Sequence, residues 1–230
     1  MRTTLLRTTS LLGVTLGAAV FAARPLFSST AHHGPLPNPT VDAPPTRAAQ
    51  ETAVLAGGCF WGMQLVFEHV KGVTAVTAGY AGGNANTATY EQVETGTTGH
   101  AESVRIVFDP SVVTYGELLK VYFSVAHDPT ELNRQGPDTG PQYRSAIFYT
   151  TPEQKQVAES YIAQLTKAKT FDSPIVTQVV PLKGFYAAES YHQEYAVHHP
   201  DQPYIVINDL PKVQNLREEL PALYRDALVP

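Results

Sequence analysis

The sequence predicts an α+β fold in which helices pack on a mixed β-sheet, and three observations lead to this prediction. From Thr52 onward, segments with helical spacing of apolar residues alternate with short β-rich runs. Turn-forming dipeptides separate these segments: two glycine pairs, Gly57-Gly58 and Gly82-Gly83, and Asp109-Pro110. The length of 230 residues suits one domain with an appendage.

The first βαβ unit is expected between residues 52 and 81. Residues 52–56 form a short apolar run that ends in two glycines, which is typical of a buried strand and a tight turn. Residues 73–81 are β-rich and again end in two glycines. Between them a helix is predicted by apolar residues at helical spacing, Phe60, Met63, Val66, Phe67 and Val70.

A second unit is expected between residues 101 and 149. Residues 101–108 alternate weakly and should form a strand. Thr114 has the character of a helix N-cap, and Glu117 three residues later completes a capping box, so a helix should run from there to about Val125. A further strand is expected at residues 144–149.

The last elements are a long helix and a strand. Thr151-Pro152-Glu153 should open a helix that ends near Lys167. A strand is expected at residues 175–180, and the tail 213–226 has a partly helical pattern that breaks near Pro221. The complete order predicts ferredoxin-like βαβ units joined by long loops. Loops of such length are usually functional, and they span residues 82–100, 127–143 and 181–204.

Composition narrows the class of protein. Hydrophobic residues make up 43% of the chain and charged residues 16%, as in globular proteins. The formal net charge of -5 provides no basic field. Nucleic-acid binding is therefore not expected as the main task.

The first 50 residues are not expected to belong to the folded domain. Arg2 and Arg7 precede an uncharged stretch, residues 8–23, that has the pattern of a secretory signal peptide. Residues 1–23 are thus predicted to be a signal peptide or, alternatively, an uncleaved signal anchor. Residues 24–50 are proline-rich and are expected to be a linker that contributes little to the core. The folded domain should span residues 51–230 and work outside the cytoplasm, in a periplasm or as a secreted protein. In the alternative of an uncleaved anchor, residues 8–23 would hold it to the membrane.

Cys59 is the only cysteine of the chain. A disulfide within the chain, a four-cysteine zinc site and a C-x-x-C pair are therefore excluded. Cys59 falls at the junction of the first strand and the first helix, where free backbone N–H groups and the helix dipole favour a thiolate. Phe60 and Trp61 add aromatic surface next to the sulfur.

Several segments resemble the A-type peptide methionine sulfoxide reductases over roughly residues 53–208. The signature Gly58-Cys59-Phe60-Trp61-Gly62 is the most specific of them. Other segments agree in order and spacing: Thr77 to Gly83, Thr89-Tyr90, Gly99-His100-Ala101-Glu102, Val104-Arg105-Ile106, Asp109-Pro110, His127 to Thr130, Asn133 to Asp138, Gln142 to Ile147 and Tyr191 to Tyr195.

The resemblance implies roles for individual residues. Cys59 would be the nucleophile that attacks the sulfoxide sulfur, and Glu102 would be the acid that protonates the sulfoxide oxygen. That role requires a carboxyl group that is still protonated near neutral pH, which burial can provide. Phe60 and Trp61 would line the pocket for the S-methyl group.

Three more substrate-binding residues follow from the same resemblance. Tyr90 and Tyr143 match the hydroxyl groups that donate to the sulfoxide oxygen. Asp138 matches a residue that organises the site, although an aspartate in a Gly/Pro-rich loop is often only a turn former.

The implied activity is thiol-dependent reduction of methionine S-sulfoxide, free or in oxidised proteins, through a sulfenic acid on Cys59. It would serve to repair oxidative damage. Many family members use a second cysteine, which this chain lacks. An external reductant, either a thioredoxin-like protein or a small thiol, must therefore complete the cycle. No cofactor or metal is expected, and the chain is expected to be a monomer.

Three other functions remain open from the residues alone. A Cys-His hydrolase could pair Cys59 with His100 or His192. A metal-binding protein could use the histidines at positions 127, 192, 198 and 199, although their spacing is not a recognised zinc pattern. A non-catalytic module that binds oxidised methionine is the third alternative.

Overall fold

The computed structural model describes residues 36–44 and 48–228. The predicted signal segment, residues 1–23, lies outside the described residues, as does the first part of the predicted linker. Within the described ranges, no helix is both long and apolar enough to cross a bilayer.

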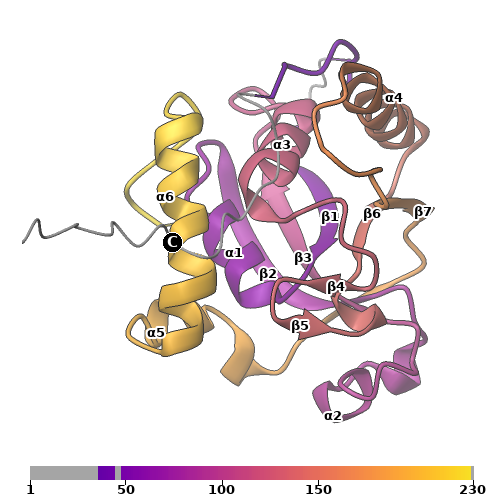
Figure 1. Ribbon diagram of the computed structural model, residues 1–230, viewed down its shortest axis with the longest axis vertical. Coiled ribbons are helices and arrows are strands. Elements are labelled where there is room, and N and C mark those ends of the chain that lie inside the picture. The colour runs from indigo at the N-terminus through magenta and orange to yellow at the C-terminus, as the bar shows by residue number, and fades with distance from the viewer. Residues whose placement is uncertain (1–35, 45–47, 229–230) are drawn as a thin grey trace, which may run out of the picture.

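A six-stranded sheet forms the centre of the molecule, in the order β7-β6-β1-β3-β2-β8 (Figure 1). All neighbouring strands are antiparallel except β6 and β7, which are parallel, so the sheet is mixed as predicted. The strands are β1 (Glu51–Gly57), β2 (Val73–Ala81), β3 (Ala101–Phe108), β6 (Ser145–Tyr149), β7 (Gln178–Pro181) and β8 (Phe185–Ala187).

The four middle strands have the ferredoxin-like connection that the element order predicts. Helix α1 (Phe60–Glu68) connects β1 to β2, and α3 (Tyr115–Val121) lies between β3 and β6. Because β1 and β2 both pair with β3 in antiparallel fashion, they run parallel to each other and need the crossover helix between them. The chain thus follows the β-α-β-β-α-β pattern.

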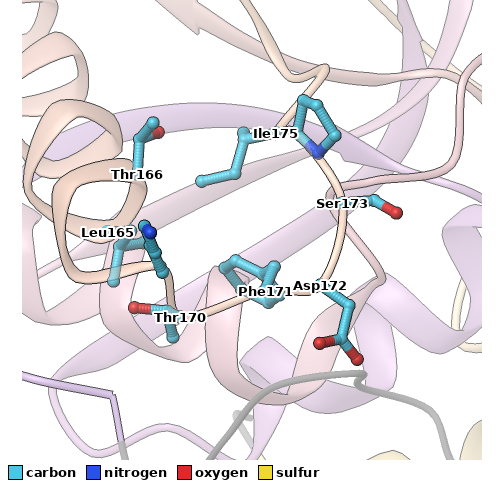
Figure 2. A pocket seen from close by; sticks show the side chains of 9 residues that line it. Leu165, Thr166, Thr170, Phe171, Asp172, Ser173 and Ile175 are labelled. Atoms are coloured by element: carbon cyan, nitrogen blue, oxygen red, sulfur yellow. The ribbon is translucent and has the colours of Figure 1, made fainter.

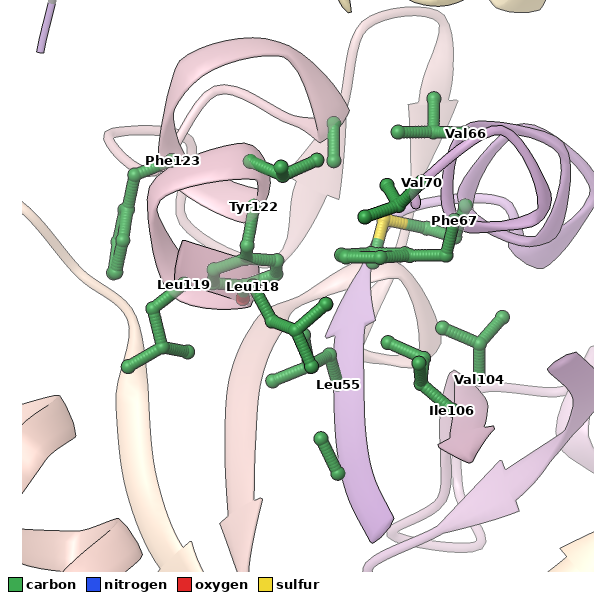
Figure 3. Close-up of a cluster of buried hydrophobic side chains, with 14 of the residues drawn as sticks. Leu55, Val66, Phe67, Val70, Val104, Ile106, Leu118, Leu119, Tyr122 and Phe123 are labelled. Carbon is green, nitrogen blue, oxygen red and sulfur yellow. The ribbon is translucent and has the colours of Figure 1, made fainter. Parts of the chain in front are cut away.

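Alternation along the strands divides the core between the two faces of the sheet. One face of the sheet points toward the helices and carries Leu55 of β1 and Val104 and Ile106 of β3. These side chains pack against Phe67 of α1 and Leu118 of α3 (Figure 3). The opposite face carries a smaller cluster that includes Val54, Ala56 and Phe148. Even-numbered positions of β3 from Glu102 onward therefore point toward the helices.

The predicted helices are confirmed with small changes at their ends. Thr114 and Glu117 form the expected capping box, and α3 continues as the π-helix η2 (Tyr122–Ala126). Helix α4 (Pro152–Ala168) begins after the N-cap Thr151. The tail forms α6 (Leu210–Glu219), preceded by the π-helix η5 (Ile205–Asp209), and α6 contacts α1 (Figure 1).

The three long loops hold short elements that the sequence patterns do not predict. These are α2 (Tyr90–Val93), the two-stranded β4 (Arg134–Gln135) and β5 (Asp138–Thr139), the 3-10 turns η1 (Ala85–Thr87), η3 (Pro141–Tyr143) and η4 (Ser190–His192), strand β8, and α5 (Tyr195–His198). Elements of two to four residues are too short to show a period of apolar residues.

Part of the predicted linker packs on the domain, which corrects the expectation that residues 24–50 contribute little to the core. Leu36 is buried, and the Tyr161 hydroxyl of α4 donates to the Pro37 carbonyl over 2.8 Å. Asp42 accepts hydrogen bonds from the Thr114 hydroxyl and from the Gly116 backbone N–H at the start of α3. A proline-rich composition disfavours regular secondary structure, but it does not prevent single side chains from filling positions on a neighbouring domain.

Candidate functional site

Cys59 is the N-cap residue of α1, directly after the Gly57-Gly58 turn that leaves β1. The backbone of Gly58 is left-handed, with φ +92, and a Cβ atom there would lie 2.4 Å from Cγ of Gln135 in β4. Glycine is therefore required both by the backbone angle and by the approach of the β4–β5 hairpin. The Cys59 residue is only 8% exposed, so its sulfur is shielded by the surrounding elements.

Glu102 reaches the same helix terminus from the adjacent sheet. It lies on β3, on the face toward α1, and its Oε2 accepts a hydrogen bond from the Phe60 backbone N–H over 2.9 Å. Glu102 is 3% exposed. Burial raises the pKa of Glu102 to about 8, the Phe60 bond opposes that shift, and the charges of Glu94 and Asp138 add to it. The carboxyl group is therefore mostly protonated at neutral pH.

The charge state of Cys59 differs from the expected thiolate. Burial raises the pKa of Cys59 well above its ordinary value, and the nearby carboxyl groups of Glu102 and Asp209 raise it further. The backbone N–H of Trp61 acts in the opposite direction, as expected for a helix terminus. Loss of water and the neighbouring acids outweigh the helix terminus, so the resting residue is a thiol.

An aromatic wall stands beside Cys59. Phe60 is 1% exposed and contacts the ring of His192 at a centroid distance of 5.1 Å. Trp61 is half-buried, stacks on Tyr195 at 3.8 Å, and meets the edge of Tyr204 at 6.0 Å. Its indole Nε1–H donates to Nδ1 of His192 over 3.2 Å.

His192, Tyr195 and Tyr204 were not predicted as site residues. The 181–204 loop was expected to be functional, and it contains all three, but single aromatic residues in a loop do not reveal which ring they contact. His192 is buried and accepts the Trp61 indole N–H.

The remaining predicted residues come from the loops around the same terminus. The Asp138 carboxylate, on β5, accepts a hydrogen bond from the Tyr204 hydroxyl. The Tyr143 hydroxyl, on η3, donates to Oε1 of Glu94 over 3.1 Å. Tyr90 opens α2, and its backbone N–H donates to Glu189, which also accepts from the Tyr80 hydroxyl. The structure thus brings all seven predicted residues to one region.

The geometry does not favour the Cys-His hydrolase. Both ring nitrogens of His100 have backbone partners, the Gly83 N–H and the Asn84 carbonyl oxygen. The Nδ1 atom of His192 is engaged by Trp61. In the described part of the chain neither histidine is hydrogen-bonded to Cys59, and Nε2 of His192 is buried without a partner.

Metal binding is one of the alternatives that the residues leave open. In the described ranges, no group of three histidine, cysteine or acidic side chains is arranged to hold a metal ion.

A hollow of about 310 Å³ lies where α4 ends, with Leu165, Phe171 and Ile175 directed into it (Figure 2). None of the residues that line it belongs to the predicted site.

The chain is similar in sequence to a known protein family. Residues 51–223 match the family model described as peptide methionine sulfoxide reductase. The chain belongs to this family. It is 61% identical to peptide methionine sulfoxide reductase MsrA 2 of Mesorhizobium japonicum, across 76% of this chain and 90% of the relative. It is 54% identical to MsrA 2 of Synechocystis, across 80% and 87% of the two chains.

Solved structures agree with the family assignment. Methionine sulfoxide reductase A of Corynebacterium diphtheriae is 36% identical, with a TM-score of 0.58, over 77% of this chain and 92% of that one. Reduced Mxr1 from Saccharomyces cerevisiae is 32% identical, with a TM-score of 0.61, over 68% and 90%. The predicted fold class and enzyme class are thereby confirmed: this reductase is a thiol-dependent oxidoreductase acting on methionine sulfoxide.

Proposed function

We propose that this reductase uses Cys59 as nucleophile and Glu102 as proton donor to reduce methionine S-sulfoxide, free or in oxidised proteins. The observation that carries the proposal is the shared position of these two side chains at the start of α1, where the Glu102 carboxyl accepts the Phe60 N–H. A buried thiol and a carboxyl group with a raised pKa form the pair that sulfoxide reduction requires.

The reaction balances without any further group. The Cys59 sulfur bonds to the sulfoxide sulfur while the sulfoxide oxygen takes the proton of Glu102, and Glu102 in turn accepts the thiol proton. The oxygen is then transferred to Cys59 as a sulfenic acid, and methionine leaves. The cysteine sulfur loses the two electrons that the substrate sulfur gains.

The aromatic and hydroxyl groups bind the substrate in this proposal. Phe60 and Trp61 hold the S-methyl group against their rings, because a methyl group gains most from a dry apolar wall. Tyr90 and Tyr143 donate hydrogen bonds to the polarised oxygen. Asp138, fixed by the Tyr204 hydroxyl, organises the segment next to them.

An external thiol completes the cycle, because the chain has one cysteine. Its sulfur attacks the sulfenic acid to form a mixed disulfide with Cys59 and water, and a second thiol releases Cys59 and an external disulfide. A thioredoxin-like protein or a small thiol fits this chemistry. The chain works as a monomer in this scheme, since a dimer linked through Cys59 would block the reactive sulfur. A thioredoxin with its second cysteine replaced by serine should be trapped on Cys59 and detected by mass spectrometry.

We also propose that the enzyme works outside the cytoplasm, with residues 1–23 as signal peptide or anchor. The support is the charged start and the uncharged stretch 8–23. Fractionation of tagged full-length protein tests it, and an unprocessed product found only in the cytoplasm contradicts it.

The central experiment measures reduction of the separate enantiomers of methyl p-tolyl sulfoxide with dithiothreitol. Wild type should turn over the S enantiomer, and Cys59→Ser should have no activity. Glu102→Gln should lose about 10²-fold or more in kcat/KM, since an amide keeps the size but cannot release a proton. Full activity of Cys59→Ser would disprove the nucleophile, and full activity of Glu102→Gln would disprove the acid.

A further inference from the structure

Glu94 lies among the groups of the site, although neither the motifs nor the expected roles single it out. It follows directly after α2, which begins at Tyr90. Residues four positions apart lie on the same face of a helical turn, so the Tyr90 and Glu94 side chains are neighbours. The pKa of Tyr90 is raised, by burial first and then by the charge and hydrogen bond of Glu94.

A second hydroxyl reaches the same carboxyl group from the other side. Tyr143 donates to Oε1 of Glu94 over 3.1 Å. The preceding residue, Gln142, donates its amide to the Glu94 backbone carbonyl over 3.3 Å. Two successive residues of η3 thus hold Glu94, so one residue connects α2 to η3, the two segments that carry the hydroxyl groups of the site.

Glu94 is also an electrostatic neighbour of the acid. Its side chain is exposed. Two charges raise the pKa of Glu102, and the effect of Glu94 is larger than that of Asp138. The other titratable groups that interact with Glu102 are Cys59 at the N-cap of α1, Tyr80 on β2, Tyr90 on α2 and Tyr143 on η3.

We propose that Glu94 is a positioning residue of this reductase, whose carboxylate holds the Tyr143 hydroxyl at the site and ties α2 to η3. The charge of the same carboxylate also raises the pKa of Glu102. The inference rests on the proposed role of Glu102 as proton donor. In the free enzyme the Tyr143 hydroxyl donates its one proton to Glu94, which fixes the position of the phenol, and in the complex the sulfoxide oxygen replaces the carboxylate as acceptor. Glu94 itself does not touch the reacting atoms.

The charge effect is tested with Glu94→Gln, which keeps an acceptor for Tyr143 and removes only the charge. The rate of a single turnover, measured as methionine formed without reductant, is followed against pH. The alkaline limb of the profile should move to lower pH by on the order of half a unit, and the shift should shrink in about 1 M salt because Glu94 is exposed. Glu91→Gln, an exposed neighbour on α2, is the matched control and should keep the wild-type profile.

The hydroxyl effect is tested with Glu94→Ala in two backgrounds. In the wild-type background the KM for the sulfoxide should rise severalfold, because Tyr143 loses its anchor. In a Tyr143→Phe background the same substitution should leave KM unchanged, since the two residues act as one unit. An equal rise in both backgrounds would overturn this part of the inference.

Failure of the inference is distinguishable from failure of the proposed function. If Glu102→Gln is inactive but the Glu94→Gln profile coincides with that of Glu91→Gln, the acid stands and the inference on Glu94 is wrong. If Glu102→Gln retains wild-type turnover and the alkaline limb, the proposed function itself is wrong.

Discussion

The indole of Trp61 stacks on the phenol ring of Tyr195 with a centroid distance of 3.8 Å and an angle of 12° between the rings. Trp61 is the only tryptophan of the chain, so its fluorescence reports on this site alone. The stack fixes the wall beside Cys59 from an element, α5, that the sequence patterns do not predict.

Tyr195→Ala should therefore weaken substrate binding. Offset or parallel aromatic pairs contribute about 0.5–1.5 kcal/mol beyond the area they bury, so a rise in KM of roughly 2–10-fold is expected. Trp61 emission should shift as the ring gains water. Tyr195→Phe keeps the stack and is the control. Unchanged emission and KM in Tyr195→Ala would mean that Trp61 is held by its other contacts.

Gly62 on α1 is predicted to be intolerant of any side chain. A Cβ atom there would lie 2.0 Å from Oδ1 of Asp209, a buried carboxyl group at the start of α6 that is paired with Lys212 at 3.1 Å. Gly62→Ala should push α6 away from α1 and cost about 1–3 kcal/mol in the free energy of unfolding, measured by urea denaturation. Gly136→Ala is a useful comparison, because a Cβ there meets no atom within 4 Å and only its φ of +55 is strained.

The Asp209–Lys212 pair makes a related prediction. Lys212→Met should leave the Asp209 charge buried without a partner, at a cost of about 3–5 kcal/mol. The double variant with Asp209→Leu should recover much of that loss, because no charge then remains buried. A double variant as unstable as Lys212→Met alone would show that packing, and not charge, determines the effect.

Stability should fall between pH 4.5 and 7 because of Glu68 on α1. Burial raises the pKa of Glu68 from its ordinary value of 4.5 to about 7, the charge of Glu194 adds to this, and Gln64 and Arg225 oppose it. The folded state therefore binds more protons than the unfolded state in this window, so the free energy of unfolding decreases as pH rises through it, by at most about 3 kcal/mol.

Glu68→Gln should remove this contribution. Urea midpoints at pH 5 and pH 8 should differ less in Glu68→Gln than in wild type, and the variant should be the more stable protein at pH 8. Glu159→Gln is the control, since Glu159 forms only an exposed ion pair with Lys155. Parallel losses in wild type and Glu68→Gln would assign the pH dependence to other groups.

The comparison of sequence and structure shows where local patterns carry information. The apolar spacing of α1 and the capping box of Thr114 and Glu117 are local, and both elements form where they were predicted. The resemblance placed Cys59 and Glu102 in one site, and β3 indeed brings Glu102 to the start of α1.

Contacts between distant segments could not be predicted in the same way. The Trp61–Tyr195 stack and the Tyr143–Glu94 bond join residues 134 and 49 positions apart, respectively, and no spacing within one segment specifies them. The protonation of Cys59 could not be predicted from one segment either. The helix terminus is visible in the sequence, but the burial and the Asp209 charge that outweigh it come from the folded chain.

The segment 36–44 provides the last prediction, because its role was misjudged from composition. Asp42 accepts from the Thr114 hydroxyl and the Gly116 N–H, so it supplies a negative charge and acceptors at the start of α3. Asp42→Ala should lower the free energy of unfolding by about 0.5–2 kcal/mol, as the loss of a cap does. Asp42→Asn keeps an acceptor and should lose less. A true linker makes no such contacts. Identical free energies of unfolding for wild type and Asp42→Ala would therefore show that residues 36–44 act as a linker, as their prolines indicate.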